Sequence, residues 1–256
     1  VVPTVPPGTM EVTAHRGFGK VFPENTVTAA RRAAEHADRV EVDVRRCGSG
    51  ELVASHFERV RFTTDGKGRI GELSADELAS LSVQGSGEGI PLVADVADAV
   101  PADTGVMFDL KGPALADDTI AVAESIDNRV VVSSFYSDAL WEARAAADDL
   151  ALSYHFDVRL ERNATTARLL DCEYVSPHWT VALCTDVVER AQEAGRKVEP
   201  WPVTSTAVAR LLDRKGVDGI VATTPRIGRR EVDGLGYAEA LTEALPAVER
   251  LRALTP

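Results

Sequence analysis

Residues 40–46 read "VEVDVRR", a run in which valines alternate with charged residues. Alternation with a period of two is typical of a β-strand with unlike faces, so Glu41 and Asp43 point to the same side. Short strand-like runs recur along the chain on both sides of this one. They cover residues 11–15, 40–45, 52–56, 105–111, 129–134, 150–155, 173–177, 197–203 and 219–223.

Helical patterns separate these runs. They cover residues 26–37, 74–81, 137–147, 163–170, 185–194 and 205–215, with a last helix over 237–254. Strand–helix alternation of this kind, repeated about eight times over ~250 residues, predicts a (β/α)8 TIM barrel, with a doubly wound sheet as the alternative. A hairpin-like turn, "CGSGE" at residues 47–51, follows the second strand and predicts a small insertion there.

The composition limits domain organisation and location. No compositional break divides residues 10–256, so we expect a single domain, preceded by the Pro-rich residues 1–9 as an extension or cloning-derived residues. No apolar run reaches the length of a membrane span, which predicts no stable membrane insertion, and no signal peptide is evident. Three cysteines without zinc spacing favour a reducing compartment, the cytoplasm.

The net charge of −12 argues against binding to nucleic acid or to an anionic membrane. Only five of the 28 basic residues are lysine. Acidic, lysine-poor chains are typical of halophilic organisms, and an ordinary acidic cytosolic protein from a GC-rich genome is the alternative.

Polar residues gather where the predicted strands end, which is where the chemistry of a TIM barrel lies. These positions hold His15, Arg16, Glu41, Asp43, His56, Asp109, Lys111 and Trp201. Three carboxylates that converge on one mouth repel each other unless a cation lies between them. An all-oxygen ligand set favours one divalent cation, Mg²⁺ or Ca²⁺ with Mn²⁺ as a further option, over zinc.

The remaining polar residues fit an anionic substrate. Histidine carries protons near neutral pH, and Arg16 and Lys111 can bind anionic oxygens. Metal, cations and proton carriers together suit a phosphodiester. Each feature alone has a commoner structural explanation, such as a polar strand face, a core histidine or barrel packing by Trp201, so the prediction depends on their conjunction.

The motifs in this order resemble those of the glycerophosphodiester phosphodiesterase family of metal-dependent TIM-barrel enzymes. The resemblance covers nearly the whole chain. It is carried by "AHRGFGKVFPENT" from residue 14, "VEVDVRR", "ELVASH" with "TTDGKGRIGELSADEL", "MFDLKG", "VVVSSF", "GRKVEPWPV" and "GVDGIVATTP".

The resemblance implies roles for individual residues. It implies that His15 and His56 are the catalytic pair, that Glu41, Asp43 and Asp109 bind the metal, and that Arg16 and Lys111 contact phosphate. Trp201 is a further substrate-binding candidate. Glu24 and Asn25 match the turn that braces the His-Arg loop.

Three departures from the family pattern stand out. Asp109 replaces the usual glutamate, and the last strand runs into Thr223 and Thr224 where the family usually has Thr-Asp. Phe57 and Phe62 replace an aspartate and an arginine. Loss of both charges together is tolerable if the rings pack, so we expect these two side chains to touch beneath the His56 loop. The alternative is that both point outward and widen an apolar rim for a more apolar substrate.

The predicted activity is metal-dependent hydrolysis of a glycerophosphodiester to a glycerol phosphate and an alcohol. One histidine deprotonates the attacking oxygen, which is water or the glycerol's own hydroxyl, and the other protonates the leaving alcohol. One alternative is phospholipase C- or D-like cleavage of lysolipids or inositol lipids, with Phe18, Phe22 and Trp179 as contributors to an apolar rim. The other alternative is a non-catalytic barrel that binds phosphorylated ligands.

Overall fold

The strands of the computed structural model, which describes residues 10–158 and 160–227, form one sheet with eight parallel members. In the order of hydrogen bonding they are β8 (Lys197–Val198), β7 (Tyr174–Pro177), β6 (Leu152–Phe156), β5 (Val130–Ser134), β4 (Gly105–Leu110), β2 (Arg39–Arg46), β1 (Glu11–Ala14) and β9 (Gly219–Ala222). Beyond β8, Val203 pairs with Ala222 of β9, so the sheet closes on itself. The predicted TIM barrel is confirmed.

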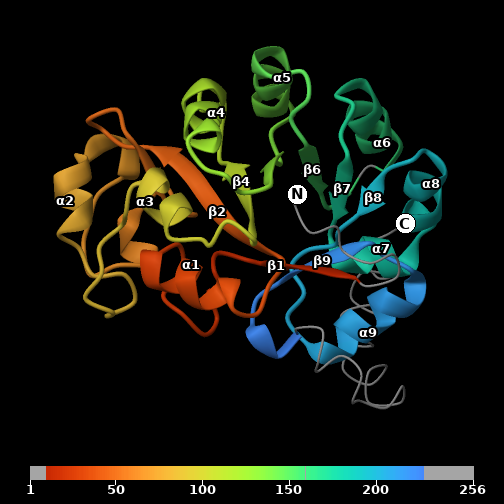
Figure 1. The fold of residues 1–256 in the computed structure, drawn as a ribbon, viewed down its shortest axis with the longest axis horizontal. Coiled ribbons are helices and arrows are strands. Elements are labelled where there is room, and N and C mark those ends of the chain that lie inside the picture. The colour runs from red at the N-terminus through yellow and green to blue at the C-terminus, as the bar shows by residue number, and fades with distance from the viewer. Residues whose placement is uncertain (1–9, 159, 228–256) are drawn as a thin grey trace.

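Helices lie around the outside of the strands (Figure 1). They are α1 (Val27–Ala34), α2 (Ala75–Ala79), α3 (Val93–Asp98), α4 (Ala116–Glu124), α5 (Ser137–Ala146), α6 (Leu160–Leu169), α7 (Trp179–Cys184), α8 (Val187–Glu193) and α9 (Thr206–Lys215). Polar caps fix several starts: the Thr26 side chain accepts a hydrogen bond from Ala29 N, and Ser74 forms a capping box with Glu77.

The predicted insertion after the second strand is present, at the left of Figure 1. Strand β3 (Leu52–Ala54) pairs antiparallel with β2. It is followed by two short 3₁₀-helices, η1 (Val60–Phe62) and η2 (Ile70–Glu72), and then by α2. Val53, Ile70 and Leu78 are among the residues of a small apolar core within this insertion. Another 3₁₀-helix, η3 (Pro225–Ile227), follows β9.

Strand β2 shows why the barrel interior is polar. Val40, Val42 and Val44 belong to the apolar core that includes residues of the surrounding helices. The alternate side chains of Arg39, Glu41 and Asp43 are buried as well, so they face the inside of the barrel. Because both faces of the strand are covered, its charged residues must find partners in the interior.

The structure differs from the sequence expectations at several element bounds. Residues 197–203 were expected to form one strand, but β8 ends at Val198 and only isolated bridges continue it. Pro200 and Pro202 explain this, because proline lacks the backbone N–H that a ladder requires. Helices α3, α4 and α7 had no predicted range. The extension over 1–9 and the helix over 237–254 lie outside the described residues.

Candidate active site

The predicted catalytic, metal-binding and phosphate-contacting residues lie at the end of the barrel where the parallel strands terminate. His15 and Arg16 follow β1, Glu41 and Asp43 lie in β2, and Lys111 follows Asp109 of β4. His56 reaches the same place from β3, because Ser55 N donates to the Asp43 carbonyl at 3.0 Å and sets the next residue beside that strand.

The His-Arg loop after β1 has an unusual backbone. Arg16, Gly17 and Phe18 all have positive φ, at 53°, 68° and 59°. A side chain at Gly17 would come within 2.9 Å of the Ala29 Cβ, so the loop needs glycine there both for its φ and for its contact with α1. Positive φ at non-glycine residues stores strain, which persists where the surroundings hold it, as at functional sites.

The three carboxylates form a compact buried group. Oxygen atoms of Glu41, Asp43 and Asp109 lie within 4.8 Å of one another. Register accounts for this, because Asp43 and Asp109 are paired neighbours on β2 and β4, and Glu41 lies two residues before Asp43.

Polar neighbours hold each carboxylate in place. Asn25 donates from Nδ2 to Asp43 at 2.7 Å and accepts from the Asp43 backbone N–H at 3.0 Å. The Arg16 backbone N–H donates to Glu41 at 2.5 Å, and Ser133 donates to Asp109 at 3.1 Å. The Pro-Glu-Asn turn therefore braces the carboxylate group as well as the His-Arg loop.

Two cations enter this group. Lys111 Nζ contacts Asp43 Oδ1 at 2.5 Å and also contacts Asp109. The Arg16 guanidinium lies 3.4 Å from both Asp43 and Glu24. Burial alone would lower the pKa of Lys111, but Asp109 and Asp43 raise it, so Lys111 is charged.

Glu41 and Asp43 have opposite pKa shifts. Burial, together with the charges of Asp43 and Asp109, raises the pKa of Glu41 well above its usual range. Burial also acts to raise the pKa of Asp43, but Lys111, the hydrogen bond with His56 and the charge of Arg16 lower it well below its usual range. Glu41 therefore holds a proton more tightly than Asp43 does.

The two predicted histidines both lie at this group. His56 Nδ1 is 3.2 Å from Asp43 Oδ1, and the His56 carbonyl accepts two hydrogen bonds from Arg45, at 3.1 and 2.8 Å. Burial, followed by the Arg16 charge, lowers the pKa of His15 well below its usual value, so its imidazole is neutral at neutral pH.

The predicted contact between Phe57 and Phe62 is confirmed. Their ring centroids are 5.3 Å apart, and the Phe57 ring also packs edge-on to His56 at 4.8 Å. The Arg16 guanidinium lies 5.7 Å from the Phe57 ring centre. The Phe57 ring thus contacts Phe62, His56 and Arg16.

Trp201 lies in an aromatic wall of the mouth. Its ring packs against Phe135, His155 and His178, with centroids 4.7, 6.2 and 5.4 Å away. The indole N–H donates to the Ser176 carbonyl at 2.8 Å, so only the ring is left to contact a substrate.

Two mouth residues were missed in the sequence. Arg45 was hidden within the charged run of β2. His155 lies on β6 two residues after the inward Ser153, and the spacing that identified Glu41 and Asp43 could have identified it. The expected contribution of Phe18 to an apolar rim is wrong, because its side chain is fully buried in the hydrophobic core.

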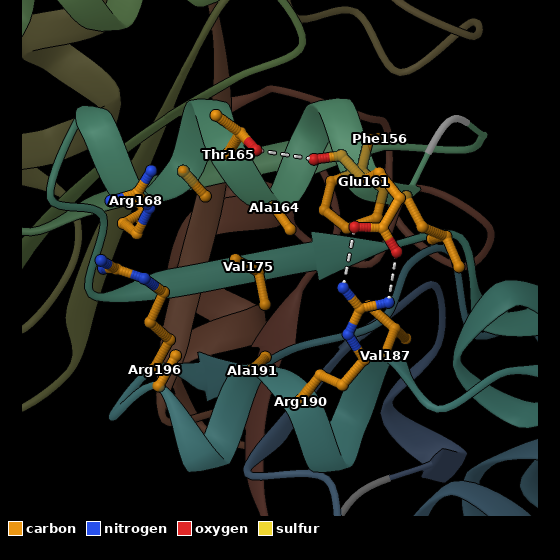
Figure 2. Close-up of a pocket in the computed structure, with 13 residues that line it drawn as sticks. Phe156, Glu161, Ala164, Thr165, Arg168, Val175, Val187, Arg190, Ala191 and Arg196 are labelled. Carbon is orange, nitrogen blue, oxygen red and sulfur yellow. Dashed lines mark hydrogen bonds and ion pairs between the residues drawn. The ribbon is translucent and has the colours of Figure 1, made fainter.

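A cavity of about 270 Å³ lies elsewhere, on the outer side of β7 between α6 and α8 (Figure 2). Its walls include Phe156, Ala164 and Val175, and Arg190 forms a two-point ion pair with Glu161 at one side. None of the predicted site residues lines it.

Among the described residues, no helix has the length and apolar character needed to cross a membrane.

Comparisons with known proteins agree with this geometry. The model of the glycerophosphoryl diester phosphodiesterase family matches residues 15–226. A glycerophosphodiester phosphodiesterase of Caldanaerobacter subterraneus is 29% identical over 229 residues, which cover 84% of this chain and 94% of that protein.

Solved structures give the same result. The structure of an Oleispira antarctica phosphodiesterase in complex with the product sn-glycerol-3-phosphate is 26% identical, with a TM-score of 0.77, covering 88% of this chain and 97% of that one. A putative glycerophosphodiester phosphodiesterase from Galdieria sulphuraria is 27% identical, also with a TM-score of 0.77, covering 85% of this chain and 95% of that one.

Proposed function

The chain belongs to the glycerophosphoryl diester phosphodiesterase family and is thus a phosphoric diester hydrolase, and from this premise we propose that it hydrolyses glycerophosphodiesters to a glycerol phosphate and an alcohol. The observation that carries the proposal is the buried group of Glu41, Asp43 and Asp109 with His56 hydrogen-bonded to one of its members. The product bound by the Oleispira relative is a glycerol phosphate, in agreement with this reaction.

The carboxylate group fits a divalent cation. Its oxygens are hard ligands, they lie within 4.8 Å of one another, and all three residues are buried. The raised pKa of Glu41, caused by burial and by the charges of Asp43 and Asp109, supports a site that a bound cation would stabilise. When bound by Glu41, Asp43 and Asp109, a cation such as Mg²⁺ or Ca²⁺ supplies Lewis acidity toward a phosphoryl oxygen.

The remaining side chains have complementary roles in the proposal. Arg16 and Lys111 lie at the carboxylate group, next to the place where the proposal puts the phosphate. Their positive charges therefore bind the phosphate oxygens. His15 and His56 move the protons of the attacking and leaving oxygens. Asp43 orients His56 through Nδ1, which leaves Nε2 directed away from that contact. Trp201 contacts the substrate through its ring.

Location is part of the proposal as well. Cys47, Cys172 and Cys184 are unpaired, which supports a reducing compartment such as the cytoplasm. The acid excess and the scarcity of lysine support a halophilic source.

A second candidate function is cleavage of lysolipids at the same site. Several exposed apolar side chains lie in segments that follow strands at the mouth: Val21, Phe62, Phe135, Tyr136 and Val158. A rim of this kind would receive an acyl chain, although the net charge of −12 opposes contact with an anionic lipid surface.

One assay separates the candidates. Purified protein is incubated with Mg²⁺ and either glycerophosphocholine or lysophosphatidylcholine, and free choline and the phosphate esters are measured. The proposal predicts choline and glycerol 3-phosphate from glycerophosphocholine, at a higher kcat/KM than for the lysolipid. Faster turnover of the lysolipid favours the second candidate. Binding of glycerol 3-phosphate without cleavage of either diester would leave only a non-catalytic barrel.

A further inference from the structure

A third histidine, His155, lies inside the mouth without a role in the proposed reaction. Its strand, β6, points Tyr154 and Phe156 toward α6 and directs Ser153 and His155 to the barrel interior. His155 is 5% exposed. Among the described residues, neither of its ring nitrogens has a hydrogen-bond partner.

An unsatisfied imidazole is costly at such a depth. A buried polar group without a partner is destabilising by the full cost of its desolvation, which is why nearly all such groups in native proteins are satisfied. Ser153 nearby meets this requirement by pairing with Ser176 at 3.0 Å. No atom of the described residues does the same for His155, so its partner is either an ordered water or a molecule that enters the mouth.

The neighbours of His155 show which kind of molecule fits. Phe135 stacks on the ring at 5.2 Å, and Trp201 lies edge-on at 6.2 Å with its N–H already donated to Ser176. These rings offer apolar contact and do not compete for the imidazole nitrogens. Phe135 is 40% exposed, so part of its ring is open to a ligand in the mouth.

The charge state of His155 indicates which ligand group can hydrogen-bond to its ring. Burial lowers its pKa to about 4, and the nearby Lys111 acts in the same direction against Asp109 and Asp43. The ring is therefore neutral at neutral pH. A neutral imidazole presents one N–H donor and one lone pair, which matches an alcohol hydroxyl better than it matches an anionic phosphate oxygen.

We propose that His155 is a substrate-contacting residue whose ring nitrogen hydrogen-bonds a hydroxyl of the glycerol moiety, while Phe135 and Trp201 pack against its carbon atoms. This inference rests on the proposed function. It makes His155 a determinant of the preference for a glycerol ester over an ester of an alcohol that lacks further hydroxyls.

The test compares glycerophosphocholine with propylphosphocholine, which lacks both free hydroxyls of the glycerol. The ratio of kcat/KM for the two diesters should fall roughly 10- to 100-fold in His155→Phe, which keeps a stacked ring and removes both nitrogens. His155→Gln should restore part of the ratio. Tyr154→Phe, which removes a hydroxyl on the other face of β6, should leave the ratio unchanged. An equal ratio in wild type and His155→Phe overturns the proposal.

A binding measurement covers the case in which the Phe variant does not fold or the protein turns over neither diester. In ¹⁵N-histidine-labelled wild-type protein, glycerol 3-phosphate should shift the ring-nitrogen resonances of His155, and propyl phosphate should not. The resonances are assigned by their loss in His155→Gln. Unchanged resonances at saturating glycerol 3-phosphate contradict the proposal and assign the imidazole to an ordered water. Because this readout needs no turnover, it separates failure of the proposal from failure of the hydrolase function.

Discussion

The buried ion pair between Arg39 and Glu199 offers a prediction that depends only on the fold. Both side chains lie inside the barrel at 0% and 1% exposure, on β2 and just after β8. Thr13 of β1 donates to Glu199 at 2.7 Å and accepts from Arg39 at 3.1 Å. The network thus ties together three strands around the closure of the barrel.

The perturbation is Glu199→Gln, which removes one charge at nearly constant volume. Among the described residues, Arg39 would keep Glu11, at 3.4 Å and 12% exposed, as its carboxylate partner. Breaking a buried pair by loss of one partner costs about 3–5 kcal/mol, and we expect the lower end because Glu11 remains. For a chain of 256 residues, ~3 kcal/mol corresponds to a decrease in Tm of roughly 6–12 °C.

The assay is thermal unfolding followed by circular dichroism, with Glu173→Gln as the matched control. Glu173 pairs with Lys197 at 2.9 Å, but both side chains are about half exposed, at 45% and 47%. An exposed pair contributes at most about 1 kcal/mol. The double variant Arg39→Met/Glu199→Leu should recover much of the loss, because it leaves no unpaired charge. A Tm for Glu199→Gln no lower than that of Glu173→Gln refutes the reasoning.

Three further predictions concern the mouth and the surface. His15→Ala and His56→Ala should each lower kcat about 10²–10⁴-fold, and the double variant should lose far less than the product; near-normal kcat in either single variant removes that histidine from the mechanism. The pKa of His155 lies below its unfolded value, so the stability it contributes is present above about pH 6.5 and is lost as the pH falls toward 4. Urea titrations should show that wild type loses about 2 kcal/mol more than His155→Phe between pH 7 and pH 5; equal losses contradict the shift. The Tm should rise in molar KCl, since the screening length falls to ~3 Å; equal values at low and molar KCl reject a halophilic surface.

The sequence predicted the barrel and the carboxylate group because both depend on local spacing. A period of two on β2 placed Glu41 and Asp43 on one face, and the position of Asp109 near a strand end placed it beside them. The alternation of residues within one strand is a local property, so it can be recognised in a single sequence before the packing of the strands is known.

What the sequence left undetermined depends on tertiary contacts. In β6, the period of two in "LSYHF" places His155 on the inner face, but its position between Phe135 and Trp201 depends on how other strand ends pack around it. The two hydrogen bonds from Arg45 to the His56 carbonyl depend on the antiparallel pairing of β3 with β2. Helices α3 and α7, of six residues each, are too short to show a helical period.

The most direct test of the metal-dependent hydrolase is a titration of glycerol 3-phosphate release from glycerophosphocholine against free Mg²⁺, after exhaustive chelation. We predict no release in chelator, full recovery on addition of the metal, and a curve for Asp109→Asn displaced to higher Mg²⁺, because one ligand charge is gone. Asp117→Asn, an exposed position of α4, should follow the wild-type curve. Full activity in the chelated wild-type protein would contradict the assignment of Glu41, Asp43 and Asp109 as the metal centre.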